Sequence, residues 1–267
     1  MNIDANRLLA VAEEAATEAG ALIFQKRKTA FKVSKKGKVN LVTEVDLAAE
    51  ELIVSTVHRH FPEHQILAEE RGSAEGTVPI KWVIDPIDGT TNYAHDYPFF
   101  CVSIGIEIEG ALAAGVVHDP VSRETFTAVS GEGAYLNGKP IQVSSESSLV
   151  DSLLVTGFSY GTPEIQKNLR LFNEMMMEAR SVRRDGSAAL DLCYVACGRY
   201  EGFWELSLQP WDVAAGSLIV QEAGGMVTRF DQTNATIYDR ECLATNGKVH
   251  QAISEILTRA CNFPDDL

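Results

Sequence analysis

Apolar residues recur every three or four positions near the start of the chain, which predicts an amphipathic helix over residues 4–25. Its apolar positions are Leu8, Val11, Ala12, Ala15, Ala19, Leu22 and Ile23. Residues 31–40 are polar and rich in lysine, and they predict a mobile loop or a ragged hairpin. Thr43 and Asp46 then stand in the pattern of a capping box, which predicts a second helix that ends near Phe61.

Alternation of apolar residues with smaller or polar ones dominates the middle of the chain and predicts strands. A loop is expected over residues 71–79 and a short strand over 82–84. Asn137-Gly138 predicts a tight hairpin turn. The further strands are expected over 100–108, 111–118, 124–129, 153–156, 200–205, 226–230 and 242–244. The helices of the second half are expected over 163–180, 187–197, 211–223 and 248–261.

The order of these elements bears on the fold class. Strands and helices come in groups rather than in strict alternation, which favours a layered α+β fold. With 267 residues the chain can form one large unit or two halves. We expect a single unit over 1–267, with a soft boundary near 144–151 between an N-terminal half (1–147) and a C-terminal half (148–267).

Composition is that of an ordinary globular protein, since 45% of the residues are hydrophobic and 22% are charged. There is no run of eighteen apolar residues, and no secretory signal is expected at the N-terminus. Five cysteines are scattered without a CxxC pair, which favours small buried residues in a reducing cytoplasm. The spacing of His58, His60 and His64 does not converge on one helix face, so we expect all three at a solvated surface.

The formal net charge of −14 restricts the classes of partner. It argues against general nucleic-acid binding and against attraction to a membrane surface. It would also repel a phosphorylated substrate, unless divalent cations held by the protein neutralised the charge locally.

The segment 82–92 (WVIDPIDGTTN) carries the most informative chemistry of the chain. Asp85 and Asp88 bracket a proline directly after an apolar segment, so both carboxylates and the carbonyl of Ile87 are held in place. Mg²⁺ prefers such oxygen ligands, completed by water and a substrate phosphate. Gly89 follows at once and lets a phosphate approach backbone N–H groups closely. The segment therefore predicts a metal site that also binds phosphate.

Further acids could complete this site, although each has a plainer explanation. Asp46 and Asp212 stand in first helical turns, where an acid also stabilises the positive end of the helix dipole. Glu69 follows the apolar residues 66–68 and could equally be a solvated loop acid. Carboxylates about 4 Å apart repel by ~4 kcal/mol at an effective dielectric constant of 20, so a cluster of four would raise its pKa values or bind metal. Thr90 adds a hydroxyl within reach of a water at such a metal.

At this point the residues resemble the inositol monophosphatase family. Residues 85–92 (DPIDGTTN) are similar to the first signature of that family, and 211–216 (WDVAAG) with 222–225 (EAGG) to the second. Three further segments stand in the family's order and spacing, namely 41–46 (LVTEVD), 69–70 (EE) and 184–189 (RDGSAA). The resemblance implies a layered α/β/α/β/α sandwich of the sugar-phosphatase type. It also implies a cytoplasmic homodimer and a phosphatase that is sensitive to Li⁺ and holds two to three Mg²⁺ per site.

The resemblance also implies roles for individual residues. The implied metal ligands are Glu69, Asp85, the carbonyl of Ile87, Asp88 and Asp212. Asp46 and Thr90 would orient and deprotonate the attacking water, and the implied catalytic set is Asp46, Glu69, Asp88 and Thr90. The implied substrate-binding residues are Gly89 and Thr90 at the phosphate, and Asp88, Gly186, Ser187 and Glu205 at the polyol hydroxyls. Lys35 matches a loop lysine that covers the site in the family.

The expected reaction is hydrolysis of a phosphate monoester, specifically inositol monophosphate, by a water that Mg²⁺ activates. Glu205 favours inositol, because inositol-specific members carry an acid there for the polyol hydroxyls; an ordinary strand-end acid is the alternative. Histidinol phosphate, fructose bisphosphate and 3′-phosphoadenosine 5′-phosphate are alternative substrates for the same fold. A non-catalytic metal- or partner-binding protein is a further alternative. We expect a small-molecule phosphate ester as the partner, and no nucleic acid or membrane.

Overall fold

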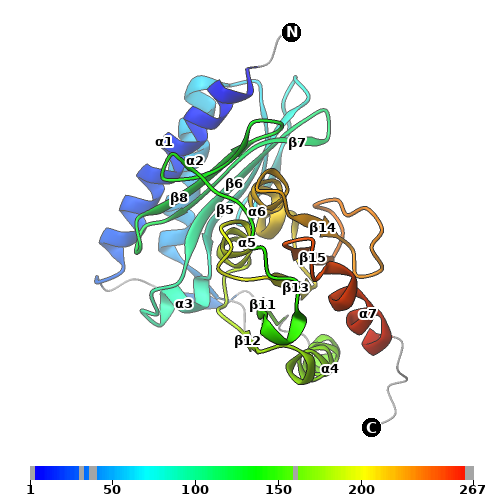
Figure 1. The fold of residues 1–267 in the computed structure, drawn as a ribbon. Helices are drawn as coiled ribbons and strands as arrows, with labels where there is room; N and C mark the ends of the chain where they lie inside the picture. Colours follow the sequence, from blue (N-terminus) through cyan, green and yellow to red (C-terminus); the bar gives the residue numbers. More distant parts are fainter. Residues whose placement is uncertain (1–3, 30–32, 36–40, 159–161, 262–267) are drawn as a thin grey trace.

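Two β-sheets are stacked with helices between them and on both outer faces (Figure 1). The structure is a computed structural model that describes residues 4–29, 33–35, 41–158 and 162–261. The longer helices are α1 (Ala5–Lys26) and α2 (Glu44–His60) outside the first sheet, α5 (Ala188–Ala196) and α6 (Pro210–Glu222) between the sheets, and α4 (Thr162–Glu178) and α7 (His250–Cys261) outside the second; the short helix α3 spans Thr90–Ala94. This order of layers confirms the expected α/β/α/β/α sandwich.

The first sheet has eight strands in the order β10-β9-β8-β7-β6-β5-β3-β4. β3 and β5 are parallel, and the other neighbours are antiparallel. Its strands are β3 (Gln65–Ala68), β4 (Gly72–Ala74), β5 (Ile80–Asp88), β6 (Cys101–Ile108), β7 (Ala111–Asp119), β8 (Glu124–Val129), β9 (Gly133–Leu136) and β10 (Lys139–Pro140). The prediction of a loop over 71–79 was wrong at β4, where the chain folds back onto β3.

The second sheet has five strands in the order β12-β11-β13-β15-β14. The first three run parallel, while β15 pairs antiparallel with both of its neighbours. Its strands are β11 (Leu153–Thr156), β12 (Ser181–Arg183), β13 (Gly202–Leu206), β14 (Met226–Thr228) and β15 (Glu241–Thr245). A 3₁₀ turn over Leu149–Asp151 precedes this sheet. The strand β12 was not expected from the sequence.

Local sequence explains several of these boundaries. The capping box at α2 is present, because Thr43 N–H and Asp46 N–H are satisfied by each other's side chains. Asn137 and Gly138 both have positive φ, as a two-residue hairpin turn of the expected kind requires. The segment expected to be a ragged hairpin pairs β1 (Val33–Lys35) with β2 (Leu41–Thr43), and residues 36–40 lie outside the described residues.

Strand β5 is central to the fold because both of its faces are covered. Trp82 and Ile84 pack among the residues of α1 and α2, whereas Val83 faces the helices between the sheets. The strand extends beyond the expected 82–84 and includes the paired acids. Its register with β6 shifts between Asp85 and Asp88. The two acids therefore stand at an irregular strand end within the core.

The prediction for the three histidines was wrong at His64. His58 and His60 are exposed, but His64 is only 8% exposed. Its ring stacks on Phe61, and Trp82 Nε1 donates to His64 Nδ1 at 3.0 Å. Burial lowers the pKa of His64, so the ring acts as a neutral acceptor in the core.

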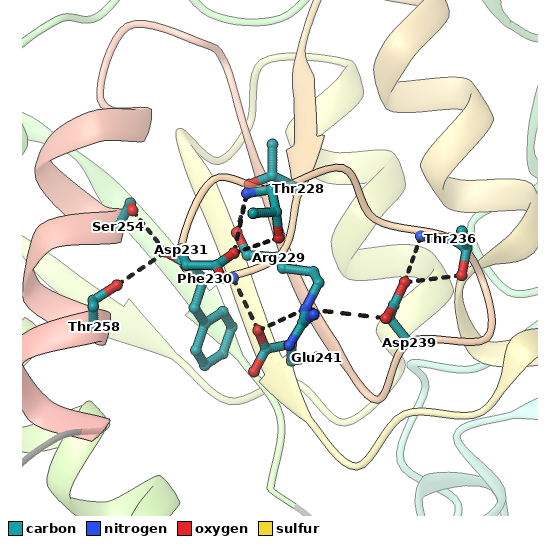
Figure 2. Close-up of polar contacts among 10 residues, drawn as sticks. Thr228, Arg229, Phe230, Asp231, Thr236, Asp239, Glu241, Ser254 and Thr258 are labelled. Carbon is teal, nitrogen blue, oxygen red and sulfur yellow. Dashed lines mark hydrogen bonds and ion pairs between the residues drawn. The ribbon is translucent and has the colours of Figure 1, made fainter.

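The connection between β14 and β15 is tied to the rest of the second half (Figure 2). The carbonyl of Phe230 accepts hydrogen bonds from Ser254 Oγ and Thr258 Oγ1 of α7 at 2.6 and 3.2 Å. Arg229 pairs with Glu241 at 3.3 Å on the other side of the connection. Over the described ranges, no helix is both long enough and apolar enough to span a membrane.

Candidate active site

A cavity of about 650 Å³ opens where β5 ends and where α5 and α6 begin. The structure brings ten of the residues singled out in the sequence to its wall: Glu69, Asp85, Ile87, Asp88, Gly89, Thr90, Gly186, Ser187, Glu205 and Asp212. Asp46 lies behind this wall. The backbone of Lys35 is in β1, and its side chain lies outside the described part of the structure.

Asp88 joins the two halves of the chain. Its Oδ2 atom accepts hydrogen bonds from Ser187 Oγ and from the backbone N–H of Ala189, each at 2.7 Å. Ala189 is in the first turn of α5, so the carboxylate also stands at the positive end of that helix. Asp85 is held locally, because Ile87 N–H donates to its Oδ1 at 3.0 Å. Both carboxylates are therefore oriented by donors before any ligand binds.

Asp46 is fully buried and forms a chain of hydrogen bonds with two threonines. Thr43 donates to Asp46 Oδ2 from its N–H at 2.8 Å and from its hydroxyl at 2.5 Å. Thr90 Oγ1 is 3.2 Å from Asp46 Oδ1 and 3.0 Å from the carbonyl oxygen of Ile87. Thr43 therefore binds Oδ2 of Asp46, while Oδ1 contacts the hydroxyl of Thr90, which lines the cavity.

Asp212 both stabilises a helix N-terminus and lies at the candidate site, the two positions considered for it from the sequence. Gln209 N–H donates to Asp212 Oδ2 at 2.7 Å, so the side chain caps the N-terminus of α6. The same side chain also lines the cavity. Capping and ligand binding are compatible here, because a carboxylate has several lone pairs and the cap uses one oxygen.

The acids raise one another's pKa values. Burial raises the pKa of Asp85 well above its usual range, and the charges of Glu69, Asp88, Asp212 and Asp46 add to the effect. Burial likewise raises the pKa of Asp212, with Asp88 and Glu69 contributing. For Asp88, burial raises the pKa to about 6 although Ser187 and Ala189 oppose it by hydrogen bonding. Several negative charges thus share a space that water solvates poorly.

This donor set fits a hard divalent cation. The group consists of carboxylates and one backbone carbonyl, which are the ligands that Mg²⁺ prefers. A bound cation would also offset the repulsion that raises the pKa values. Within the described ranges, no three Asp, Glu, His or Cys side chains already have the arrangement of a metal site. The chemistry of the ligands fits, while their side chains are not yet gathered around one point.

The cavity is also lined by Gly186, Ser187 and Glu205 of the C-terminal half. A Cβ atom added at Gly157 would lie 2.0 Å from Glu205 Oε2, so the strand end at Gly157 leaves room for this carboxylate. Burial raises the pKa of Glu205, and the charges of Asp212 and Asp88 contribute. These three residues add a hydroxyl and a carboxylate to the cavity wall, and none of them carries a positive charge.

Sequence reasoning missed other residues near the site. Phe158, Arg184 and Trp211 line the cavity. Arg184 and Trp211 stand in segments that resemble the family, but no role was predicted for either, and Phe158 has no such signal. Asp191 is fully buried in α5, and neither of its carboxylate oxygens has a hydrogen-bond partner among the described residues. Its only signal in the sequence was an acid inside an otherwise apolar helical segment, 188–196.

We expect Asp191→Asn to stabilise the protein more at pH 8 than at pH 5. Burial raises the pKa of Asp191, with the charges of Asp185 and Glu205 adding to it. The carboxyl of Asp191 has a higher pKa in the folded protein than in the unfolded chain. It therefore lowers the free energy of unfolding as pH rises from the unfolded pKa to the folded pKa. The neutral amide escapes this loss, so Tm at pH 8 should rise by roughly 3–6 °C. Scanning calorimetry at both pH values measures it.

The exposed Glu18→Gln is the control for removal of one negative charge. Its Tm difference from the parent protein should be the same at both pH values. An equal Tm gain for the Asp191 variant at pH 5 and pH 8 would contradict the assignment of a buried, charge-sensitive carboxyl.

Comparison with known proteins gives a consistent picture. The family model described as the inositol monophosphatase family matches residues 4–261. The chain is 46% identical over 258 residues to the inositol-1-monophosphatase of Synechocystis sp., covering 95% of this chain and 90% of that protein. It is 44% identical to the Nus factor SuhB of Escherichia coli, covering 92% and 94%. The structure of an inositol monophosphatase from Anabaena is similar with a TM-score of 0.87 and 44% identity, covering 95% and 96%.

Proposed function

Since the chain belongs to the inositol monophosphatase family, we propose that it is a Mg²⁺-dependent phosphatase that hydrolyses inositol monophosphate to inositol and phosphate. The observation that supports this most directly is that four acids line one cavity: Glu69, Asp85, Asp88 and Asp212. A net charge of −14 would otherwise repel such a substrate.

The proposed metal ligands are Glu69, Asp85, the carbonyl of Ile87, Asp88 and Asp212. When bound, Mg²⁺ supplies charge neutralisation at the phosphate and a lowered pKa for a coordinated water. Backbone and hydroxyl donors orient these carboxylates by hydrogen bonds. Ser187 Oγ donates to Asp88, and Gln209 N–H donates to Asp212. These hydrogen bonds reduce the conformational freedom that the carboxylates of Asp88 and Asp212 would lose on binding a cation.

Asp46 and Thr90 would take the proton of the attacking water. Thr90 Oγ1 is 3.2 Å from Asp46 Oδ1, so the hydroxyl can accept a proton from water and pass its own to the carboxylate. Burial raises the pKa of Asp46, which makes its ionised form a stronger base than an exposed aspartate. Because water attacks directly, the proposal needs no covalent enzyme intermediate.

The substrate would lie with its two ends against different parts of the cavity. Backbone N–H groups of Gly89 and Thr90 would bind the phosphate, since Gly89 has φ of +96° and no side chain in the way. Asp88, Gly186, Ser187 and Glu205 would bind the polyol hydroxyls. In this division Gly89 and Thr90 bind the phosphate, while Gly186, Ser187 and Glu205 contribute to substrate selection from the start of α5 and from β13.

Removal of Mg²⁺ is expected to abolish phosphate release and to lower Tm. Saturating Mg²⁺ at 100 times its Kd would stabilise the folded protein by about 2.7 kcal/mol, or roughly 5 °C in Tm. Asp85→Asn should lose this Tm shift, whereas Asp191→Asn should keep it. Calorimetry with Mg²⁺ or EDTA measures binding separately from activity, and a shift that survives in Asp85→Asn would contradict the ligand assignment.

The substrate is tested by comparing kcat/KM for a panel of phosphate esters with Mg²⁺ present. Inositol 1-phosphate is expected to exceed histidinol phosphate, fructose 1,6-bisphosphate and 3′-phosphoadenosine 5′-phosphate. A hundredfold preference for one of those three would replace the substrate and leave the phosphatase proposal intact. No phosphate release from any of them would overturn the phosphatase proposal.

The relative named Nus factor SuhB marks a second role within the family. The chain is 46% identical to the inositol-1-monophosphatase and 44% identical to SuhB, so sequence identity does not decide between the two roles. We favour the phosphatase because all four acids proposed as metal ligands line the cavity. We predict that the chain forms a homodimer, which light scattering would test. We also predict that it binds no nucleic acid, which a gel-shift titration with RNA would test.

A further inference from the structure

The side chain of Asn92 is placed where the two halves of the chain meet beside the cavity. Asn92 is in the short helix α3 (Thr90–Ala94), directly after the paired acids. Its Nδ2 atom is 2.8 Å from the carbonyl oxygen of Phe99 and 2.9 Å from that of Asp185. The carbonyl oxygen of Gly186 lies near the same atom at 3.4 Å. One amide group therefore links an N-terminal loop to the loop before α5.

The chemistry of the partners determines how this amide is oriented. All three neighbours are carbonyl oxygens, which only accept hydrogen bonds, so the NH₂ group and not the amide oxygen must face them. Two hydrogens satisfy the two short bonds, and the third oxygen is a longer contact. Without the NH₂ group, three carbonyl dipoles would point at one another with nothing to offset their repulsion.

The loop that Asn92 holds carries residues at the substrate side of the cavity. Gly186 has φ of +90°, and a Cβ atom added there would lie 3.2 Å from Asn92 Nδ2. A Cβ atom added at Gly89 would lie 3.3 Å from the carbonyl oxygen of Gly186, so the two loops are in close backbone contact. A second tie holds the loop from behind, where Tyr200 OH donates to Asp185 Oδ2 at 2.6 Å.

We propose that Asn92 is a positioning residue that sets how far the 184–187 loop stands from the phosphate side of the cavity, and thereby sets selectivity for polyol phosphates. The inference rests on the proposed function, in which Gly186 and Ser187 contact polyol hydroxyls while Gly89 and Thr90 contact phosphate. Asn92 touches neither end of the substrate in this proposal. It acts through the distance between them.

Asn92→Asp is the most informative change, because Asp has the shape of Asn and lacks the NH₂ group. A carboxylate oxygen would then face the carbonyls of Phe99 and Asp185, and the loop would move away from it. Contacts to a polyol would weaken, while Ala189 N–H would still hold Asp88. The loss should therefore be larger for an ester with hydroxyl groups than for one without them.

The test compares kcat/KM for inositol 1-phosphate and p-nitrophenyl phosphate, both with saturating Mg²⁺. In Asn92→Asp the ratio of the two values should fall at least tenfold, with a raised KM for inositol 1-phosphate as the main cause. A tenfold change corresponds to about 1.4 kcal/mol of lost transition-state binding. A ratio within twofold of that of the parent protein would overturn the proposal.

Asn246→Asp is the matched control. Asn246 is 3% exposed, and its NH₂ group donates to Ser144 Oγ at 2.9 Å and to the Glu146 carbonyl at 2.7 Å. The same substitution there removes a buried bridge that does not line the cavity, so it should lower Tm and leave the substrate ratio unchanged. Equal falls of the ratio in both variants would show a general structural effect and contradict the proposal.

Amide hydrogen exchange tests the clamp independently of catalysis. Peptides that cover residues 184–190 should exchange at least fivefold faster in Asn92→Asp than in the parent protein, and should be unchanged in Asn246→Asp. Unchanged exchange in Asn92→Asp would overturn the proposal even if activity fell. If the parent protein hydrolysed neither ester, the proposed function would fail, and the exchange result would still decide whether Asn92 holds the loop.

Discussion

Asp88→Asn is expected to reduce phosphate release by roughly 10³-fold or more, because it would remove one negative ligand from the metal site proposed above. The amide oxygen of Asn can still accept from Ser187 Oγ and Ala189 N–H, so the contact between the two halves should survive. Its NH₂ group would then face the other acids, where it cannot bind a cation. Initial rates with Mg²⁺ measure the loss.

Two observations separate a lost ligand from a lost fold. In the absence of Mg²⁺, the Asp88 variant should be at least as stable as the parent protein, since burial raises the pKa of the native carboxyl to about 6 despite the hydrogen bonds that it accepts. Asp191→Asn makes the same change at another buried acid and should retain activity. Full activity of Asp88→Asn with Mg²⁺ would contradict the assignment.

Gly89→Ala is expected to lower kcat/KM by roughly 100-fold, the scale of a misplacement of about 1 Å in an active site. A Cβ atom there would lie 3.0 Å from the carbonyl oxygen of Phe99 and 3.2 Å from Phe100 Cβ. Phe99 and the neighbouring loops would have to move by a few tenths of an ångström, which carries Thr90 and its N–H group with them. The positive φ of +96° adds roughly 1–2 kcal/mol of backbone strain.

Gly110→Ala is the control that separates strain from close contact. Gly110 also has a positive φ, of +82°, but no atom lies within 4 Å of an added Cβ. Both alanine variants should lose stability through strain, and only Gly89→Ala should lose activity. Denaturant titrations and initial rates on both proteins measure the two effects. If Gly110→Ala lost as much activity as Gly89→Ala, the close contact would not be the cause.

The elements that could be predicted are those whose signal is local. Periodicity over about 20 residues is enough to define α1, and the capping box at Thr43 marks the start of α2 because both partners are three residues apart. Strands of three residues, such as β4 and β12, are too short to show alternation. Their formation depends on a neighbouring strand edge, which the chain reaches only when it folds.

Burial of polar side chains was the least predictable property. His64 was expected in solvent because its spacing from the other two histidines excluded a metal site on one helix face. It is buried instead, because Trp82 offers a donor and Phe61 a ring. Asp191 looked unremarkable within its helix, but burial raises its pKa, and the charges of Asp185 and Glu205 add to the effect. Neither environment can be inferred from neighbours in the sequence.

By itself, the sequence determined the types of most elements and which acids are candidates for the site, because helical periodicity, capping residues and the spacing of Asp85 and Asp88 act over a few residues. Tertiary structure alone decided that Asp88 would meet Ser187, 99 residues away, and that the amide of Asn92 would link loops from both halves. The physical reason is range: a local pattern limits backbone conformation, whereas bringing distant polar groups together depends on how two sheets and the helices between them pack.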